Sequence, residues 1–341
     1  MPFSNYMRDR IGHAIIEPAG AFEAGSHASL TITYTAGFFG IDDTGALKIS
    51  WRTASDAAKP QFTDPKAPNY TTAHATNGAR LYLETNRNTI RPWVNTLFIR
   101  VDRGFLREGD RIVVRLGDRG QGSPGYRLQT ACEDEFFFKV FVDAFATYDF
   151  VELPDSPVIR LVPGPVARWK AILPTLRRAG DPFRLAVVAE DRWGNPTDRA
   201  DARLRLVPDR PVEGLPATLA FEPGDGPKTI DGLRLERPGD LRIDLRDDDG
   251  AGAATLLARS NPLRIVEEDA AGLLHYWGDL HGQSRETVGT NSAAQYYAFA
   301  RDKAFVDIVG HQGNDFQIDS GFWAEINRLA REFDRPGRVL V

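Results

Sequence analysis

The sequence of 341 residues predicts a multidomain fold, in which two all-β sandwich modules precede a segment of alternating strands and helices. Two observations predict the β modules: short apolar runs with a period of two that are rich in β-branched and aromatic residues, and clusters of turn residues between those runs. The third observation is a change to helical periodicity after residue 267. We therefore expect three domains, over residues 1–150, 151–266 and 267–341.

The first module contains short runs with strand character and no long helical pattern, which is typical of an all-β sandwich. These runs lie at residues 28–34, 47–51, 80–83, 96–101, 111–116 and 136–142. The intervening segment 54–77 is rich in Pro, Asp, Lys and Thr, so we expect a surface loop there. The prolines of Glu152–Pro157 mark the boundary with the next module.

The second module repeats this pattern, with strand-like runs at residues 158–162, 168–173, 183–189, 202–207 and 241–245. Between two of these runs lies Glu190–Pro196, whose Gly-Asn-Pro is a turn signal. This segment resembles the Asp-x-x-Gly-Asn turn that joins two strands in bacterial immunoglobulin-like modules. The resemblance implies an immunoglobulin-like β domain and no chemistry.

The last segment alternates strands and helices. We expect a strand over Leu273–His281, a helix from Asn291 to Lys303 and a second strand over Phe305–His311. A second helix follows up to Phe333, and Arg338–Val341 has the character of a third strand. Three parallel strands with two crossovers are less than half of a β/α barrel. We therefore expect the first βαβαβ part of such a barrel, with the chain ending inside it.

Two of the predicted strands end in a histidine. Because the carboxyl ends of parallel strands share one edge, His281 and His311 should lie near each other. A period of two places Asp279 on the face of His281, and Asp307 on the face of His311. Imidazoles and carboxylates that converge in this way suit Zn, Mn or Fe. A structural, hydrogen-bonding role is the competing interpretation for all four side chains.

Three further polar residues follow the strand ends and are also candidate metal ligands. These residues are Gln283, Glu286 and Asp315. Gln283 continues the face of His281 if the strand persists, whereas Glu286 and Asp315 belong to the two loops that follow. For these two loop residues, an ordinary polar surface role is the alternative. Asp279 and Asp307 are the candidate catalytic residues, which would orient the ligands or assist the reaction.

Two short motifs resemble the polymerase and histidinol phosphatase (PHP) superfamily. They are Gly278–Ser284 and Phe305–His311, where the superfamily usually has Asp-Leu-His-x-His and Thr-Asp-His. The resemblance implies a distorted β/α barrel that binds two or three metal ions and hydrolyses phosphoester bonds. Only His281 and His311 match its metal ligands. Gln283 replaces the second histidine of the first motif, and Gly310 replaces the aspartate of the second.

Composition limits the partners. The formal net charge is -5, and residues 267–341 carry it, with 12 Asp and Glu against 7 Lys and Arg. A general nucleic-acid binder would have a basic surface, so nucleic acid is not expected as a partner. The sequence has no signal-peptide pattern and no apolar run of membrane-spanning length, so we expect a cytoplasmic protein without a membrane partner. The single Cys132 fits a reducing compartment.

Three functional hypotheses follow, and the first of them is the leading one. The first is a PHP-like hydrolase in which metal-bound hydroxide attacks a small, phosphorylated substrate, with the present chain inactive alone because later ligands are missing. The second keeps the metal site but cleaves C–N or C–O bonds. The third is a non-catalytic protein that binds a glycan or a protein and contains a degenerate barrel. Gln283 and Gly310 favour the third hypothesis.

Overall fold

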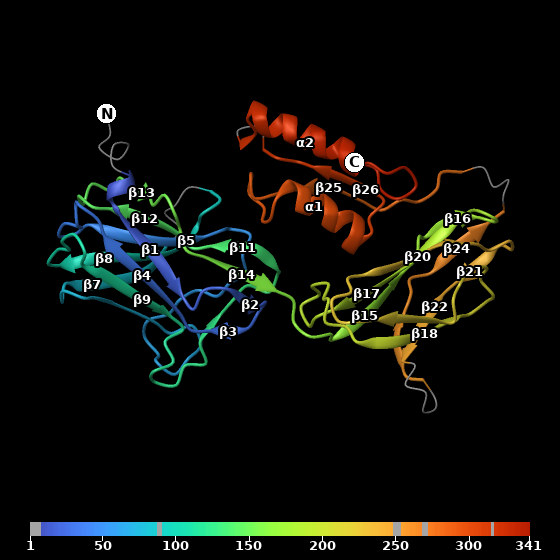
Figure 1. Ribbon diagram of the computed structural model, residues 1–341, viewed down its shortest axis with the longest axis horizontal. Helices are drawn as coiled ribbons and strands as arrows, with labels where there is room; N and C mark the ends of the chain where they lie inside the picture. Colours follow the sequence, from blue (N-terminus) through green and yellow to red (C-terminus); the bar gives the residue numbers. More distant parts are fainter. Residues whose placement is uncertain (1–7, 87–90, 248–253, 268–271, 315–316) are drawn as a thin grey trace. The chain divides into compact units, whose positions relative to one another are not determined.

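The computed structural model describes residues 8–86, 91–247, 254–267, 272–314 and 317–341 (Figure 1). The chain divides into two compact units, Met1–Val162 and Pro163–Val341. Regular structure in both units is mostly β-strand, and the α-helices that are described lie in the last part of the second unit. The prediction of a multidomain, β-rich protein is therefore confirmed.

The first unit is built on two antiparallel sheets. The four-stranded sheet has the order β1 (Gly12–Glu17), β4 (Leu30–Ala36), β9 (Arg111–Leu116) and β6 (Thr71–Ala75). The five-stranded sheet has the order β13 (Val151–Glu152), β12 (Lys139–Asp143), β5 (Ala46–Trp51), β8 (Asn95–Arg103) and β7 (Arg80–Asn86). Smaller elements are η2 (Arg8–Arg10), β2 (Ala21–Glu23), β3 (His27–Ala28), β10 (Tyr126–Arg127), β11 (Glu133–Phe137) and β14 (Val158–Val162).

One core joins the two main sheets. In β4, buried residues alternate with half-buried ones, as a period of two requires when one face of a strand is covered. Ile32 and Tyr34 of this sheet belong to the same buried cluster as Ile49 and Ile99 of the five-stranded sheet. Burial of apolar faces of two sheets against each other is what stabilises a β-sandwich.

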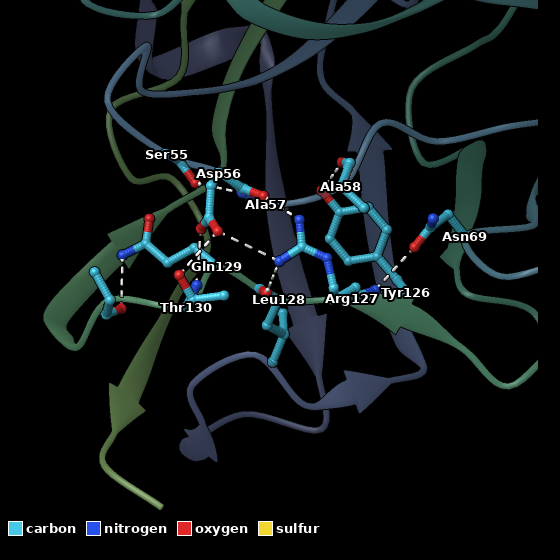
Figure 2. Close-up of polar contacts among 11 residues, drawn as sticks. Ser55, Asp56, Ala57, Ala58, Asn69, Tyr126, Arg127, Leu128, Gln129 and Thr130 are labelled. Carbon is cyan, nitrogen blue, oxygen red and sulfur yellow. Dashed lines mark hydrogen bonds and ion pairs between the residues drawn. The ribbon is translucent and has the colours of Figure 1, made fainter. Parts of the chain in front are cut away.

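The segment expected to be a surface loop is more ordered than the sequence predicted. It ends in strand β6, which pairs with β9. Its earlier part is fixed by Asp56, whose carboxylate accepts hydrogen bonds from the backbone and hydroxyl of Thr130, both at 2.8 Å (Figure 2). The hydroxyl of Tyr126 also donates to the carbonyl of Ala58 at 2.6 Å. These hydrogen bonds act together with the packing of Ala57, Ala58 and Phe62 against the core, and the composition of the segment did not reveal either.

The second unit begins with an immunoglobulin-sized β region of three small sheets. Their orders are β15 (Arg168–Ile172), β17 (Phe183–Glu190), β20 (Lys228–Leu233); β16 (Leu176–Arg178), β24 (Leu263–Val266), β21 (Gly239–Leu241); and β19 (Thr218–Phe221), β18 (Ala202–Pro208), β22 (Ile243–Asp247), β23 (Leu256–Arg259). One buried cluster joins all three sheets through Leu185, Leu204 and Leu263. The strand at residues 158–162, expected here, instead pairs as β14 in the first unit.

The last part of the chain has two parallel strands, β25 (Gly278–Gly282) and β26 (Ile308–His311). Helix α1 (Ala293–Phe299) starts at a capping box formed by Ser292 and Gln295, and it continues as the π-helical turn η3 (Ala300–Ala304). Helix α2 (Ser320–Phe333) follows, and the expected third strand is reduced to isolated bridges, of which the parallel one joins Leu340 to Ile308 of β26. The strand expected from Leu273 begins only at Gly278. A two-stranded sheet is not a barrel, so the β/α-barrel assignment is not supported.

Candidate binding site

The two strands that were predicted to carry a site are adjacent and parallel, with Gly282 opposite His311. The histidine side chains nevertheless have different partners. His281 is exposed, and its Nδ1 contacts Oε1 of Gln312. His311 is half-buried, and its Nε2 lies 2.9 Å from the hydroxyl of Ser284. Each ring is therefore held by a neutral hydrogen-bonding group from the opposite strand region.

Ser284 connects His311 to Glu286. Its buried hydroxyl donates to Oε2 of Glu286 at 2.5 Å, so its proton is not available to the imidazole. Nε2 of His311 must then donate to Oγ of Ser284, which leaves Nδ1 as the acceptor nitrogen. That Nδ1 is buried and has no hydrogen-bond partner within the described residues. Burial lowers the pKa of His311, although the negative charge of Glu286 opposes this effect.

The hydrogen bond between Ser284 and His311 runs in the opposite direction to the one between a nucleophilic serine and its general base. In a catalytic triad, the imidazole accepts the proton of the serine, whereas here the imidazole donates to it. Ser284 is also completely buried, so a substrate cannot reach its oxygen. Sequence reasoning missed Ser284, because a serine in a predicted turn carries no periodic signal.

The two candidate catalytic carboxylates bind backbone groups. Oδ1 of Asp279 accepts a hydrogen bond from the backbone nitrogen of His281 at 3.0 Å. Oδ2 of Asp307 accepts one from the backbone nitrogen of Trp277 at 2.9 Å. Asp279 also lies near Tyr296, whose hydroxyl pKa is raised by burial and then by this carboxylate. Both aspartates thus fix the backbone around β25, which is the structural interpretation.

Within the described residues, the predicted ligands Gln283 and Glu286 do not complete a metal site. Oε1 of Gln283 is buried without a hydrogen-bond partner among the described residues, and the exposed Glu286 contacts Ser284 and Arg285. Asp315 lies outside the residues that the structure describes. In the described part of the chain, no group of three or more His, Cys, Asp or Glu side chains is placed to hold a metal ion.

A cavity of about 280 Å³ lies in the second unit at the other end of the same two strands. Trp277 directly precedes β25 and Asp307 directly precedes β26, and both line it. The polar lining is completed by Thr175, Arg177, Arg184 and Asn261. The apolar lining includes Ile172, Ala186, Phe305 and Val306. The sequence had placed the site at the carboxyl ends of these strands, whereas the cavity lies at their amino ends.

Strand β17 explains how the cavity forms. Phe183, Leu185 and Val187 face the core of the β region, as a period of two requires. Ala186 and Val188 point the other way and are buried by Phe305. Arg184 shares this second face, and its Nη2 donates to the backbone carbonyl of Phe305 at 3.3 Å. The helical segment therefore covers one face of the β region and leaves the cavity beside Arg184.

Phe305 has a φ of 56°, in the left-handed region that non-glycine residues rarely adopt. This conformation ends the π-helical turn η3, and the ring of Phe305 is buried beside β17. Burial of a phenylalanine side chain contributes about 2–3 kcal/mol, which is enough to offset the cost of about 1–3 kcal/mol for a strained backbone conformation. The strain is thus balanced by the packing that shapes the cavity.

The loop that carries Thr175 is held by a side-chain amide. Asn261 accepts a hydrogen bond from the backbone nitrogen of Leu173 at 2.8 Å and donates to the carbonyl of the same residue at 2.7 Å. Its polar groups are therefore occupied in maintaining the wall. Thr175 differs, because its Oγ1 is buried and has no hydrogen-bond partner in the described structure.

The electrostatic balance of the lining is positive. Burial lowers the pKa of Arg184, and the nearby carboxylate of Asp307 is the largest opposing influence. An arginine side chain remains protonated in proteins. Arg177 adds a second positive charge, and Asp307 is the acidic residue among those lining the cavity. Two cations thus face one anion.

No protein-family model matches the chain, and no curated protein matches it. Solved structures give weak likenesses. FdeC, an Escherichia coli adhesin, has a TM-score of 0.32 and 14% identity, covering 76% of this chain and 64% of that one. Domains 4–9 of the surface layer protein SbsC have a TM-score of 0.23 and 13% identity, covering 86% and 36%. A beta-glycosidase from Bacteroides vulgatus has a TM-score of 0.25 and 9% identity, covering 75% and 24%.

The chain thus spans less than two thirds of the length of each of these three proteins. The PHP assignment is wrong. The structure is β-rich, its parallel sheet has two strands, and the described residues form no cluster of metal ligands. The corresponding assignments as a hydrolase and a metal-binding protein are not supported. No helix in the described regions is long and apolar enough to cross a membrane.

Proposed function

We propose that the chain is a non-catalytic binding protein that recognises a carbohydrate in the cavity of its second unit. The observation that carries this proposal is the combination of an exposed indole with hydrogen-bonding groups around one small cavity. Trp277 is 63% exposed although tryptophan is usually well buried, and it lines the cavity beside Thr175 and Arg184. A sugar ring presents an apolar C–H face that packs on an aromatic ring, while its hydroxyls take up hydrogen bonds.

Binding without catalysis agrees with the groups that face the cavity. General acid–base catalysis needs a carboxyl or imidazole group within hydrogen-bond reach of the reacting bond. Glycoside hydrolysis usually needs two carboxyl groups. Among the residues lining the cavity, Asp307 supplies one carboxylate, and its Oδ2 already accepts the backbone N–H of Trp277.

The experiment is a glycan array probed with the wild-type chain and two variants. Trp277→Ala should reduce binding about ten-fold or more, because a central tryptophan in a binding site usually contributes about 2 kcal/mol. Trp323→Ala is the matched control, since Trp323 is also exposed, at 59%, but belongs to helix α2 and does not line the cavity. Absence of glycan binding by the wild type, or equal loss in both variants, contradicts the proposal.

A protein partner is the second candidate, and a different surface favours it. In the first unit, Phe38 and Phe145 are each about half exposed, and both rings pack edge-on against Phe39. The guanidinium of Arg10 lies 3.8 Å from the ring of Phe38. Exposed aromatic clusters of this kind are typical of protein-binding surfaces. A Phe38→Ser, Phe145→Ser double variant should lose any protein partner while its glycan-array pattern stays unchanged.

A further inference from the structure

We infer that the ligand of this cavity is an acidic sugar, a pyranose that carries a carboxylate, and that Arg184 and Arg177 bind the carboxylate. The inference rests on the proposed carbohydrate-binding function of the same cavity. It adds the chemical class of the ligand and assigns the two residues that select it.

Arg184 is a half-buried cation with unused hydrogen-bonding capacity. Its guanidinium makes one hydrogen bond in the described structure, from Nη2 to the carbonyl of Phe305, and the nearby carboxylate of Asp307 acts on it electrostatically without forming an ion pair there. A guanidinium has five N–H donors in a planar fork that matches a carboxylate. Removing a charge from water costs free energy unless the charge is paired. Folding has already removed much of the Arg184 guanidinium from water, so an anion that pairs with it binds more tightly.

Arg177 provides the second cation from a neighbouring strand. It lies on β16 and donates through Nη1 to the carbonyl of Leu176 at 2.7 Å. Its guanidinium lies 5.4 Å from the ring centre of Tyr276, which restricts its orientation. Among the described residues it has no ion pair with a carboxylate. Both arginines are therefore placed and available for an anion.

The charge balance favours a monoanion. Among the residues that line the cavity, Arg177 and Arg184 carry two positive charges and Asp307 carries one negative charge, so the net charge of the lining is +1. A carboxylate carries one negative charge, whereas a phosphate monoester carries about 1.5 to 2 near neutral pH. A carboxylate thus neutralises the cavity, and a phosphate monoester would leave an excess of negative charge beside Asp307.

The other residues that line the cavity suit the sugar ring to which the carboxylate is attached. Trp277 offers an aromatic surface, and Ile172 and Phe305 form apolar wall. The buried Oγ1 of Thr175 has no partner in the described structure, so a ligand hydroxyl would satisfy it. The volume of about 280 Å³ lies just below the usual range of about 300–1,000 Å³ for ligand pockets, which suits a single monosaccharide unit.

The test measures affinity by isothermal titration calorimetry on the full chain. The ligands are trigalacturonate and its carboxyl-reduced neutral form, and sialyllactose and neutral lactose. The wild type should bind at least one acidic member about ten-fold or more tightly than its neutral counterpart, since a hydrogen bond to a charged group contributes about 1.5–3 kcal/mol. Which pair shows the difference identifies the acid as a hexuronate or a sialic acid.

Neighbouring residues on β16 provide a matched control. Arg177 lines the cavity, whereas Arg178 is the next residue and points to the opposite face, where it donates to the carbonyl of Gly272. Arg177→Gln and Arg184→Gln should each lose the preference for the acidic ligand, and Arg178→Gln should keep it. The thermal transition shows whether Arg184→Gln folds. If it does not fold, the comparison of Arg177→Gln with Arg178→Gln still tests whether the cavity selects the acidic ligand.

The outcomes separate the two proposals. Equal affinity for the acidic and neutral members of both pairs overturns the acidic-sugar inference and leaves carbohydrate binding intact. No binding of any of the four sugars, together with an empty glycan array, overturns both. Equal weakening by Arg177→Gln and Arg178→Gln indicates general surface charge and overturns the assignment of the cavity. A pentaglutamate peptide that binds as tightly as the acidic sugar overturns the assignment of a sugar.

Discussion

Glu133 on β11 is a buried acid without an ion pair in the described structure, 5% exposed and bonded to the side-chain amide of Gln129 at 2.9 Å. Burial raises its pKa from the ordinary value of 4.5 to about 7. Between these two pH values the folded chain retains a proton that the unfolded chain releases. The free energy of unfolding therefore falls as the pH rises from about 4.5 to 7, and the loss above that window is about 3 kcal/mol.

We expect Glu133→Gln to remove this pH dependence, because an amide keeps a hydrogen-bonding oxygen for Gln129 and has no charge to bury. The variant should be more stable than the wild type at pH 8 and similar at pH 5. Calorimetric melting at both pH values measures the difference. Glu135→Gln is the control, since Glu135 is an exposed residue of the same strand. An equal gain at both pH values would contradict the assigned cause.

Ser284 should contribute to stability through its two hydrogen bonds. Replacing it with alanine leaves Nε2 of the half-buried His311 without an acceptor, which costs about 1–3 kcal/mol. Ser284→Ala should lower the melting temperature of the second unit without changing sugar binding at the separate cavity. Ser292→Ala, at the cap of α1, is a control for a general loss of hydroxyl groups, and the imidazole C–H resonances of His311 should shift only in the first variant.

Some features of the candidate site could be predicted from individual residues, and others could not. The adjacency of β25 and β26 followed from the strand–helix–strand pattern, so placing His281 and His311 on neighbouring strands needed no coordinates. The partners of their side chains depended on Ser284 and Gln312, which lie in turns without periodicity. Arg184 was missed because it interrupts an apolar strand run, and its role depends on Phe305, which is 121 residues away along the chain.

At the scale of elements, the turn between β17 and β18 has a clear signature. The buried carboxylate of Asp191 accepts hydrogen bonds from the backbone nitrogens of Trp193 at 2.8 Å, Asn195 at 2.9 Å and Gly164 at 3.0 Å. Burial alone would raise the pKa of Asp191, but these bonds and one from the side chain of Asn195 lower it. The folded turn thus requires the ionised carboxylate, and its stability is lost as the pH falls through the lowered pKa.

We expect Asp191→Ala to destabilise the second unit by about 2–4 kcal/mol, because several buried donors lose their acceptor together. Asp198→Ala is the control, since Asp198 is exposed in the next loop and its backbone carbonyl, not its side chain, bonds to Gly224. Urea unfolding of the two variants measures the difference. A similar loss in both would mean that the turn tolerates the missing carboxylate.

Elements were predictable where local pattern and burial agree. Strand β4, with its alternating burial, and the turn after β17 are examples. Strand β6 was missed because its sequence, Thr71–Ala75, has no large apolar residue, and its pairing with β9 gives it its structure. The barrel was predicted from three strand-like runs, but two of them form the sheet, and the third pairs with β26 through the isolated Ile308–Leu340 bridge. Short motifs such as Gly278–Ser284 specify a turn after a strand and leave the larger architecture open.

At the scale of the whole molecule, the apolar cores divide the chain. The core of the first unit is a cluster of residues between Ile11 and Leu161, whereas the β region of the second unit has its own cluster between Ala171 and Ile265. The helical segment has a cluster of its own, which includes Tyr297 and Leu329, and a smaller cluster joins the β region to Phe305. Apolar burial is the main cooperative term in folding, so residues that share a core should unfold together.

We therefore predict two separable thermal transitions in the full chain, with the helical segment melting as part of the second. Glu133→Gln should shift only the transition of the first unit at pH 8, and Asp191→Ala only that of the second. Because the substitutions lie in different cores, the double variant should show the sum of the two shifts. Differential scanning calorimetry with a saturating ligand adds a direct assignment, since a ligand of the cavity should raise the second transition alone. A single transition that both substitutions move would show that the two cores unfold as one cooperative unit.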